Sequence, residues 1–289
     1  MQKRRSALFI LVLALASCGN GLSSSSSNGE TVNVIIMSGQ SNMEGWTRSK
    51  YLSTNYGEAD LATFSSGYEN VGISYKGAYT NYSSDADFVN VKLGQGLGED
   101  FFGPEIGIAK KYSSLKKNKK LYLIKYAAGG TSLSSDWKLD GSLYSQGIDY
   151  ILKSLSSLIL TGLTPRIISF LWAQGEADAL NESDSKAYKA NEKSFIESVR
   201  NSLKDYYVSS LPFIDAGVSS SPVWTYSEAV NKAKEENAKE MDVIFFSTIE
   251  AGLHYDEEPP DSPDKSHFDS DSMVKLGEIF MSKCEGYLL

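Results

Sequence analysis

Cysteine and histidine are scarce in this 289-residue chain, and their scarcity limits the chemistry open to it. There are two histidines, His254 and His267, and two cysteines, Cys18 and Cys284. Two histidines without a cysteine cluster are too few for a typical catalytic zinc site. Acidic residues gather between positions 256 and 264, but their spacing matches no calcium loop and two prolines interrupt them, so we interpret this run as a solvated loop. We therefore expect no metal.

Positive charge and long apolar runs are also in short supply. Lys and Arg total 28 against 36 Asp and Glu, which gives a formal net charge of −8. An acidic surface disfavours nucleic acid and anionic membranes as partners. The apolar run at residues 7–16 is too short to span a bilayer, which requires about 20 residues. With 41% hydrophobic and 22% charged residues, the chain as a whole has the composition of a globular protein.

The first 17 residues have the layout of a signal peptide. A basic start, Lys3-Arg4-Arg5, precedes the apolar run, and small residues lead to a cysteine in Leu15-Ala16-Ser17-Cys18. This ending resembles a bacterial lipobox, which predicts cleavage before Cys18 and attachment of lipid to its thiol. The protein would then be an extracytoplasmic bacterial lipoprotein that faces the periplasm or the cell surface. The alternative is ordinary secretion with cleavage nearby, in which Cys18 has no special role.

Processing at this point would change both charge and thiol content. Loss of residues 1–17 removes three positive charges, so the net charge falls from −8 to −11. Once Cys18 carries lipid, Cys284 is the only remaining thiol and no internal disulfide can form. Residues 18–30 include the serine run Ser23–Ser27 and are expected to form a flexible tether. The folded domain should extend over residues 31–289, with the membrane as a partner only through the N-terminal lipid.

Within this domain, strand and helix patterns alternate, which is typical of parallel strands joined by crossover helices. The predicted strands are apolar runs; they are Val32–Met37, Leu121–Tyr126, Ile167–Trp172, Phe213–Val218 and Val243–Thr248. Helical patterns lie near Ser183–Tyr206, Ser227–Glu240 and Asp271–Cys284. We therefore predict an α/β fold with a mainly parallel sheet. Ligands of such open sheets bind at the carboxyl ends of the strands, so a functional site is expected at that edge.

Ser41 is the first candidate for that site. The first predicted strand is followed by Gly39 and then, one residue later, by Ser41. A hydroxyl at the carboxyl end of a buried strand is where an open α/β sheet presents a nucleophile. A plain strand-to-helix turn has the same local pattern, so Ser41 needs partners before it can be interpreted as catalytic.

Asp264 and His267 supply those partners from one loop just before the last predicted helix. In a Ser–His–Asp triad the carboxylate orients the imidazole, and the imidazole takes the serine proton during attack and later gives one to the leaving group. We therefore predict a triad of Ser41, Asp264 and His267. The alternative for the last two is a solvated loop. If His267 is the base, activity should fall as the pH drops below about 6.5, the ordinary value for histidine.

An acyl-transfer site also needs hydrogen-bond donors aimed at the oxyanion that forms when serine attacks a carbonyl. Gly129 and Gln174 follow the second and third predicted strands, so both should lie at the same edge as Ser41. The predicted donors are the Ser41 and Gly129 amides and the Gln174 side chain. Gln174 has a simpler alternative role, in which it ties two loops together.

Residues 50–100 break the strand–helix rhythm and contain six tyrosines among Ser, Asn, Gly and Asp. We interpret them as an excursion of short strands and loops beside the active edge. Aromatic faces suit sugar rings, but tyrosines in such a segment also form a small core of their own. Three tryptophans close to the motif glycines, Trp46, Trp137 and Trp172, are better candidates for lining a pocket.

With these residues assembled, the chain resembles the SGNH hydrolases, and within them the sialate O-acetylesterase-like branch of carbohydrate esterases. The resemblance rests on five blocks in the family's order: Gly39-Gln-Ser-Asn-Met43, Phe102-Gly-Pro-Glu105, Ala127-Ala-Gly-Gly-Thr-Ser132, Trp172-Ala-Gln-Gly-Glu-Ala-Asp178 and Asp264-Lys-Ser-His267. It implies the same triad and oxyanion donors, and a structural role for Glu105. It places Gln40, Glu176 and Asp178 around the site without fixing their roles. One departure is the long approach to the last block, residues 252–263.

The resemblance implies a three-layer α/β/α sandwich of flavodoxin-like type and hydrolysis of acetyl esters on carbohydrates, without a metal or an organic cofactor. O-acetylated sialic acids and plant-type glycans such as xylan are both suitable substrates, and the sequence does not choose between them. Serine attack would give an acetyl-enzyme, which water activated by His267 would hydrolyse to acetate. Two alternatives stay open: a surface lipoprotein that binds glycans without turning them over, and a carbohydrate O-acetyltransferase that uses the same triad.

Overall fold

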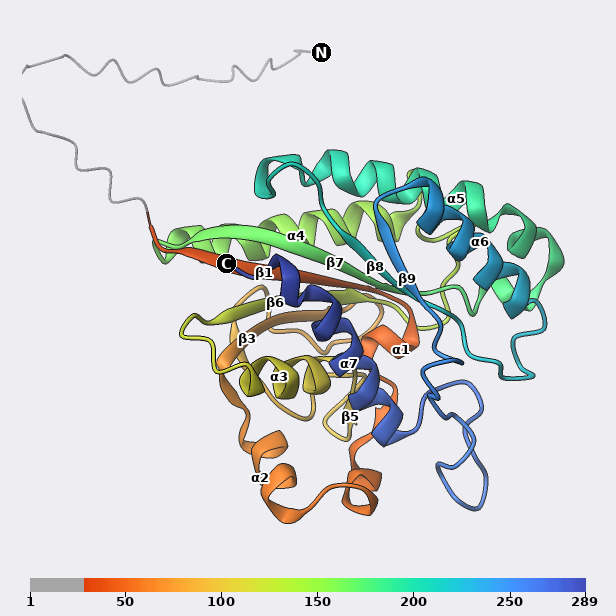
Figure 1. Ribbon diagram of the computed structural model, residues 1–289, viewed down its shortest axis with the longest axis horizontal. Helices are drawn as coiled ribbons and strands as arrows, with labels where there is room; N and C mark the ends of the chain where they lie inside the picture. Colours follow the sequence, from red (N-terminus) through yellow and green to blue (C-terminus); the bar gives the residue numbers. More distant parts are fainter. Residues whose placement is uncertain (1–28) are drawn as a thin grey trace, which may run out of the picture.

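The computed structural model describes residues 29–289. The predicted signal peptide, Cys18 and the serine run lie outside these residues. A seven-stranded sheet forms the centre of the described part, with strand order β4-β3-β6-β1-β7-β8-β9 (Figure 1). Its strands are β1 Thr31–Gly39, β3 Tyr68–Gly77, β4 Val89–Val91, β6 Leu121–Ala127, β7 Thr164–Ala173, β8 Phe213–Ala216 and β9 Val243–Phe246. Every neighbouring pair is parallel except β3 and β4, which confirms the mainly parallel sheet.

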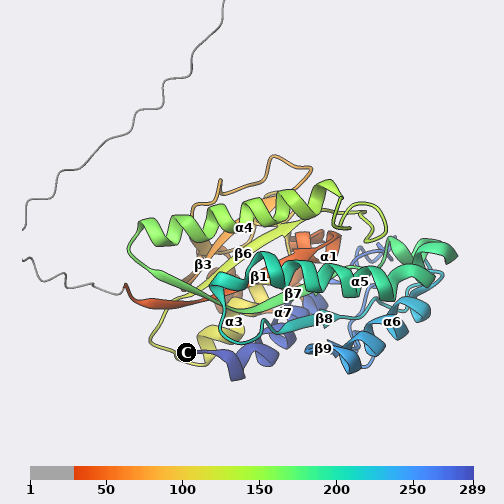
Figure 2. The same cartoon turned by 90° about the horizontal axis from the view of Figure 1, so that it is seen from above.

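Helices cover both faces of this sheet, so the fold is the predicted three-layer α/β/α sandwich (Figures 1 and 2). One face carries α4 Ser142–Leu160, α5 Glu182–Ser202 and α6 Ser227–Glu240. The other carries α2 Glu58–Ser66, α3 Glu105–Ser114 and α7 Ser270–Cys284. The short helix α1 Ser41–Glu44 follows β1, and a separate two-stranded sheet pairs β2 Thr47–Arg48 with β5 Phe101–Phe102.

The central strand β1 explains why its sequence is almost continuously apolar. Side chains alternate across a strand, and here both faces are covered by helices. Val34 and Ile36 belong to the hydrophobic cluster that includes α4 and α5, whereas Ile35 and Met37 belong to the cluster that includes α3 and α7. All four side chains are completely buried. The sheet is therefore the boundary between two cores.

Residues 68–77 correct the prediction of a separate excursion at residues 50–100. They form β3, a ten-residue strand that runs parallel to β6 within the main sheet. Tyr68 is buried in the core beneath that sheet. The polar sequence of β3 is tolerated because its buried hydroxyl is paired: Ser74 Oγ lies 2.9 Å from Tyr150 Oη and 2.8 Å from Ser154 Oγ, both on α4.

The two edges of the sheet are distinct. At the amino edge, where the parallel strands begin, lies the start of β1; at the carboxyl edge, where they end, lie α1 and the beginning of α7 (Figure 1). In β1, Gly39 is in register with Ala127 of β6 and with Ala173 of β7. The residues that follow these three strands therefore emerge together at the carboxyl edge. Among the described helices, none is both long and apolar enough to cross a membrane.

Candidate active site

The turn after β1 places Ser41 at the carboxyl edge. Gly39 has φ 147°, and a Cβ on it would lie 2.0 Å from the Ala173 carbonyl oxygen, so only glycine allows this close approach of β1 to β7. The Gln40 amide donates to the same carbonyl at 2.9 Å. Ser41 then opens α1, and it is buried with 5% of its surface exposed. Its amide has no acceptor among the described residues, as expected at a helix N-terminus.

The structure brings the predicted acid and base together. His267 Nδ1 lies 2.7 Å from Asp264 Oδ2, and the Ser266 amide donates to the other carboxylate oxygen at 3.0 Å. The hydrogen bond with His267 holds the pKa of Asp264 below its usual value. The carboxylate therefore stays ionised and can orient the imidazole. The His267 side chain is 14% exposed, while Asp264 is 50% exposed.

The Ser41 turn and the His267 loop are joined by the residues that follow Ser41 and His267, not by a direct bond between those two side chains. No hydrogen bond joins the Ser41 hydroxyl to the His267 ring in residues 29–289. Instead the side chain of Asn42, the residue after Ser41, accepts from the amide of Phe268, the residue after His267, at 3.2 Å. Catalytic hydrogen bonds are often long without substrate and tighten in the substrate complex.

Phe268 anchors the acid–base loop, residues 264–269, at both of its backbone groups. Asn42 Oδ1 accepts from its amide, and Thr47 Oγ1 donates to its carbonyl at 2.7 Å. Asn42 Nδ2 also donates to Glu176 Oε1 at 2.8 Å, which links the turn after β1 to the turn after β7. Asn42, Thr47 and Glu176 are all buried. No sequence pattern singles out Asn42 or Thr47 for this role, although Asn42 lies within the first motif block.

Both remaining predicted oxyanion donors are engaged by protein acceptors. The Gly129 amide donates to Glu44 Oε2 at 2.8 Å, and the same carboxylate oxygen accepts from Trp46 Nε1 at 2.8 Å. Gln174 Nε2 donates to Asp178 Oδ2 at 2.6 Å and to the Thr131 carbonyl at 3.0 Å. Both must exchange these acceptors if they are to bind an oxyanion, so their catalytic role stays a prediction. The loop-tying role considered for Gln174 is present in the structure.

Gln40 and Asp178 connect the turns around the site. Gln40 Oε1 accepts from the Ala177 amide at 3.2 Å. Asp178 accepts from the Leu133 and Ser134 amides at 2.8 and 3.1 Å, which joins the turn after β7 to the turn after β6. Burial raises the pKa of Asp178 despite these hydrogen bonds. Both residues therefore act on the arrangement of the loops rather than facing the pocket.

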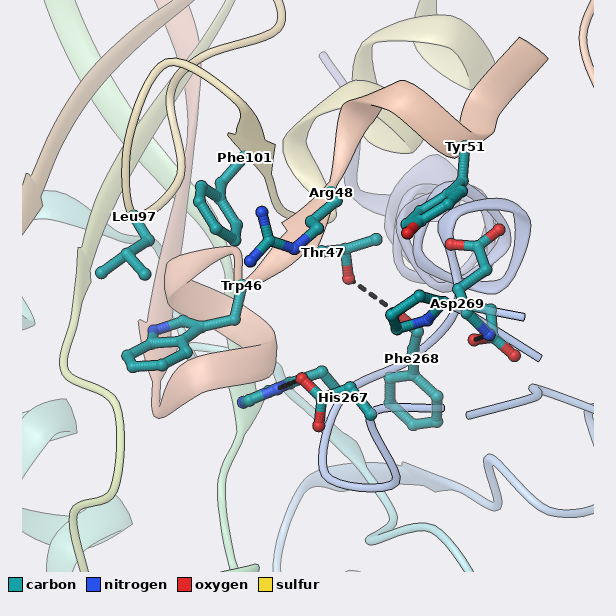
Figure 3. Close-up of a pocket in the computed structure, with 12 residues that line it drawn as sticks. Trp46, Thr47, Arg48, Tyr51, Leu97, Phe101, His267, Phe268 and Asp269 are labelled. Carbon is teal, nitrogen blue, oxygen red and sulfur yellow. Dashed lines mark hydrogen bonds and ion pairs between the residues drawn. The ribbon is translucent and has the colours of Figure 1, made fainter. Parts of the chain in front are cut away.

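A pocket of about 260 Å³ opens beside the acid–base pair. The Trp46 ring stacks on His267 with centroids 5.2 Å apart, and the Arg48 guanidinium lies 4.9 Å from the centre of the Phe101 ring (Figure 3). Tyr51 forms part of the opposite wall (Figure 3). The pocket thus presents aromatic faces and one cation close to His267.

Of the three predicted pocket tryptophans, only Trp46 lines this pocket. The prediction is wrong for Trp137 and Trp172, which are 1% and 0% exposed in the core on the α4–α5 side of the sheet. Proximity in sequence to a motif glycine does not decide which face of a strand or loop a side chain occupies. Among the described residues, no group of three His, Cys, Asp or Glu side chains is arranged to hold a metal ion.

The chain thus combines a three-layer α/β fold with a serine turn and an acid–imidazole loop that follow its central strands. The chain belongs to the family described as carbohydrate esterase, sialic acid-specific acetylesterase, whose model matches residues 31–285. It is accordingly a carboxylic ester hydrolase of the carbohydrate acetylesterase class. A search of curated protein sequences finds no match.

Solved structures with low sequence identity share the fold. A protein from Arabidopsis thaliana is 20% identical, with a TM-score of 0.65 over 89% of this chain and 99% of its own. NanS is 15% identical, with a TM-score of 0.64 over 90% of this chain and 98% of its own. A carbohydrate acetylesterase from Xanthomonas citri is 13% identical, with a TM-score of 0.55 over 88% of this chain and 56% of its own.

Proposed function

We propose that the protein is a serine esterase that removes O-acetyl groups from carbohydrates through an acetyl-enzyme. The observation that carries this proposal is the hydrogen-bonded pair of His267 and Asp264 at the wall of an aromatic pocket, tied through Asn42 to the Ser41 turn. Family membership supplies the acetylated carbohydrate as the class of substrate. The two candidate substrates are O-acetylated sialic acids and O-acetylated plant-type glycans. NanS and the carbohydrate acetylesterase from Xanthomonas citri share the fold of this chain.

The proposed reaction begins when Ser41 Oγ attacks the acetyl carbonyl carbon and His267 takes the serine proton. Asp264, held ionised by its hydrogen bond, stabilises the imidazolium that forms. His267 then gives the proton to the departing sugar oxygen, which leaves an acetyl group on Ser41. Water, deprotonated by His267, releases acetate and restores the serine.

The oxyanion requires donors at the place where charge develops. We assign the Ser41 amide first, because it is the predicted donor with no acceptor among the described residues. The Gly129 amide would join it after separating from Glu44, and Gln174 Nε2 after separating from Asp178 or Thr131.

The decisive variant is Ser41→Ala. It should abolish release of p-nitrophenol from p-nitrophenyl acetate and release of acetate from O-acetylated sialosides or xylan, because no other group forms the acetyl-enzyme. Circular dichroism and thermal unfolding serve as the control for folding. Full activity in a folded Ser41→Ala protein would exclude Ser41 as nucleophile. Transfer of acetate to a sugar acceptor instead of water would favour the acetyltransferase, and glycan binding without turnover by the wild type would favour the binding protein.

We further propose that the chain is a bacterial lipoprotein, on the grounds of the Leu15-Ala16-Ser17-Cys18 sequence at the end of the apolar run. Expression of the full chain in bacteria with radiolabelled palmitate should label the wild type and leave Cys18→Ser unlabelled. Equal labelling of the two would remove Cys18 as the acceptor.

A further inference from the structure

The amino edge of the sheet carries a basic loop that stands out in an acidic protein. The connection between α3 and β6 contains four lysines within five residues, Lys116, Lys117, Lys119 and Lys120. Lys116 and Lys117 are exposed. In the described part of the chain none of the four forms an ion pair with a carboxylate. Lys119 Nζ donates to the Thr31 carbonyl at 3.2 Å, which holds the loop against the start of β1.

An exposed apolar tip lies next to this loop. Leu160, at the end of α4, is 87% exposed, and its neighbour Ile159 is 48% exposed. Leu160 and Lys120 line the same surface groove, which also contains one carboxylate, Asp87. Lysine and leucine side chains that meet on one surface, with few carboxylates between them, fit an interface that is both anionic and partly apolar.

The described chain also begins at this edge. The Glu30 carbonyl oxygen accepts a hydrogen bond from the Thr164 amide at 2.9 Å. Thr164 lies four residues after Leu160, so the start of the described chain is close to the end of α4. The start of β1, the end of α4 and the loop before β6 lie at the same end of the molecule in both views (Figures 1 and 2). Ten residues separate Cys18 from Gly29. Fully extended, they reach at most about 36 Å, so a lipid on Cys18 would keep this edge near the bilayer.

We propose that the amino edge, consisting of residues 116–120 with Ile159 and Leu160, docks on an anionic phospholipid surface. The lysines face the headgroup phosphates, and Leu160 enters the boundary between headgroups and acyl chains. The expected net charge of the processed chain is −11, so the rest of the molecule is repelled by an anionic surface and binding selects this one orientation. The pocket at the opposite edge then opens away from the bilayer, toward glycans in solution.

The test uses residues 19–289, expressed without the signal peptide and Cys18, so that neither a lipid nor the apolar run at residues 7–16 anchors the chain. Co-sedimentation is measured with vesicles of phosphatidylglycerol and phosphatidylethanolamine, and with phosphatidylcholine alone. We expect binding to the anionic vesicles only, weakened by raising NaCl from 50 to 300 mM. Each lysine near an anionic surface contributes about fivefold to partitioning, so K116E/K117E should reduce it more than tenfold. K186E/K232E, on α5 and α6, changes the net charge equally and should bind better than K116E/K117E.

Several results would overturn the proposal. They are absence of binding to anionic vesicles at 50 mM NaCl, equal binding to phosphatidylcholine, and equal losses in the two double variants. Retention on polygalacturonate without vesicle binding would also overturn it, and would assign the lysines to an acidic polysaccharide instead. Hydrolysis of p-nitrophenyl acetate should be the same in all variants, so the outcome is separate from the proposed esterase activity.

Discussion

At the scale of the residue, the position of the base depends on two hydrogen bonds made by its neighbour. Phe268 is held by Asn42 at its amide and by Thr47 at its carbonyl, and both side chains are buried. The partners are 226 and 221 residues apart in sequence. No local pattern can report contacts of this separation. The sequence therefore located Asp264 and His267 but did not identify the side chains that hold their loop.

Removal of the Asn42 side chain should misplace His267 while Arg48 and Phe101 of the pocket stay in place. Asn42→Ala leaves a buried Phe268 amide unpaired, a change that typically costs about 1–3 kcal/mol. We expect kcat on p-nitrophenyl acetate to fall about tenfold with little change in KM. Thr47→Ser, which keeps the hydroxyl that binds Phe268, is the matched control and should retain most activity. An unchanged kcat with a raised KM would instead mean that Asn42 contacts substrate.

At the scale of the element, α3 and α7 cross at two glycines. A Cβ on Gly277 would lie 2.0 Å from the Pro104 carbonyl oxygen, and a Cβ on Gly107 would lie 1.8 Å from the Val274 carbonyl oxygen. Backbone atoms cannot move aside as a flexible side chain can. The two helices can therefore touch only because both positions lack a side chain. Since α7 begins at Ser270, directly after the acid–base loop, this crossing also fixes the direction in which that loop approaches the site.

Gly277→Ala should therefore separate α3 from α7. We expect a loss of about 3 kcal/mol in the free energy of unfolding, at the upper end for overpacking, measured by urea denaturation. Gly286→Ala is the control, because nothing lies within 4 Å of its Cβ position, and it should stay within about 0.5 kcal/mol of the wild type. Equal stabilities of the two variants would show that the helices adjust freely.

The strands β1, β6, β7, β8 and β9 could be predicted, and the failure to predict the long strand β3 has a physical cause. The apolar runs at β1, β6, β7, β8 and β9 are each buried by helices, and their sequences report that burial directly. In β3 the sequence is Tyr-Glu-Asn-Val-Gly-Ile-Ser-Tyr-Lys-Gly, and its buried Ser74 is accommodated by hydroxyls of α4. A polar residue satisfied by a distant helix looks like a loop residue in sequence. Trp137 and Trp172 were misplaced for a different reason: both lie near motif glycines in sequence, but their side chains pack into the core on the α4–α5 side of the sheet.

At the scale of the whole molecule, a buried charge cluster holds the α5–α6 side of the sheet. Lys234 of α6 pairs with Asp215 of β8, and its Nζ lies 3.6 Å from Glu192 Oε1 of α5. All three side chains are at most 1% exposed. Two carboxylates thus share one lysine away from water. Burial, together with the nearby Glu192, raises the pKa of Asp215 well above its ordinary value.

This shift fixes the direction of a pH effect on stability. Above the ordinary value of about 3.9, the unfolded chain has lost a proton that folded Asp215 still holds. The stability from this group is therefore present at low pH and declines as the pH rises through the folded pKa, by at most about 1.4 kcal/mol per unit. Asp215→Asn removes this titrating group. In urea denaturation, the free energy of unfolding of the wild type should therefore exceed that of Asp215→Asn by more at pH 5 than at pH 7. Asp205 is exposed, so the Asp205→Asn control should show the same change in free energy of unfolding between pH 5 and pH 7 as the wild type. If the wild type and Asp215→Asn differ by the same amount at both pH values, the assignment to Asp215 is contradicted.

The strand order has a consequence for how the chain reaches this structure. β1 is the first strand to be synthesised, yet it is flanked by β6 and β7, which begin only at residues 121 and 164. Its nine residues must wait for neighbours that are far away in sequence, and closing such long loops is slow. A nascent chain shorter than about 130 residues exposes an apolar segment with no partner on either side. During biosynthesis β1 is thus the segment that most needs shielding by a chaperone, and its late pairing delays the appearance of a folded domain.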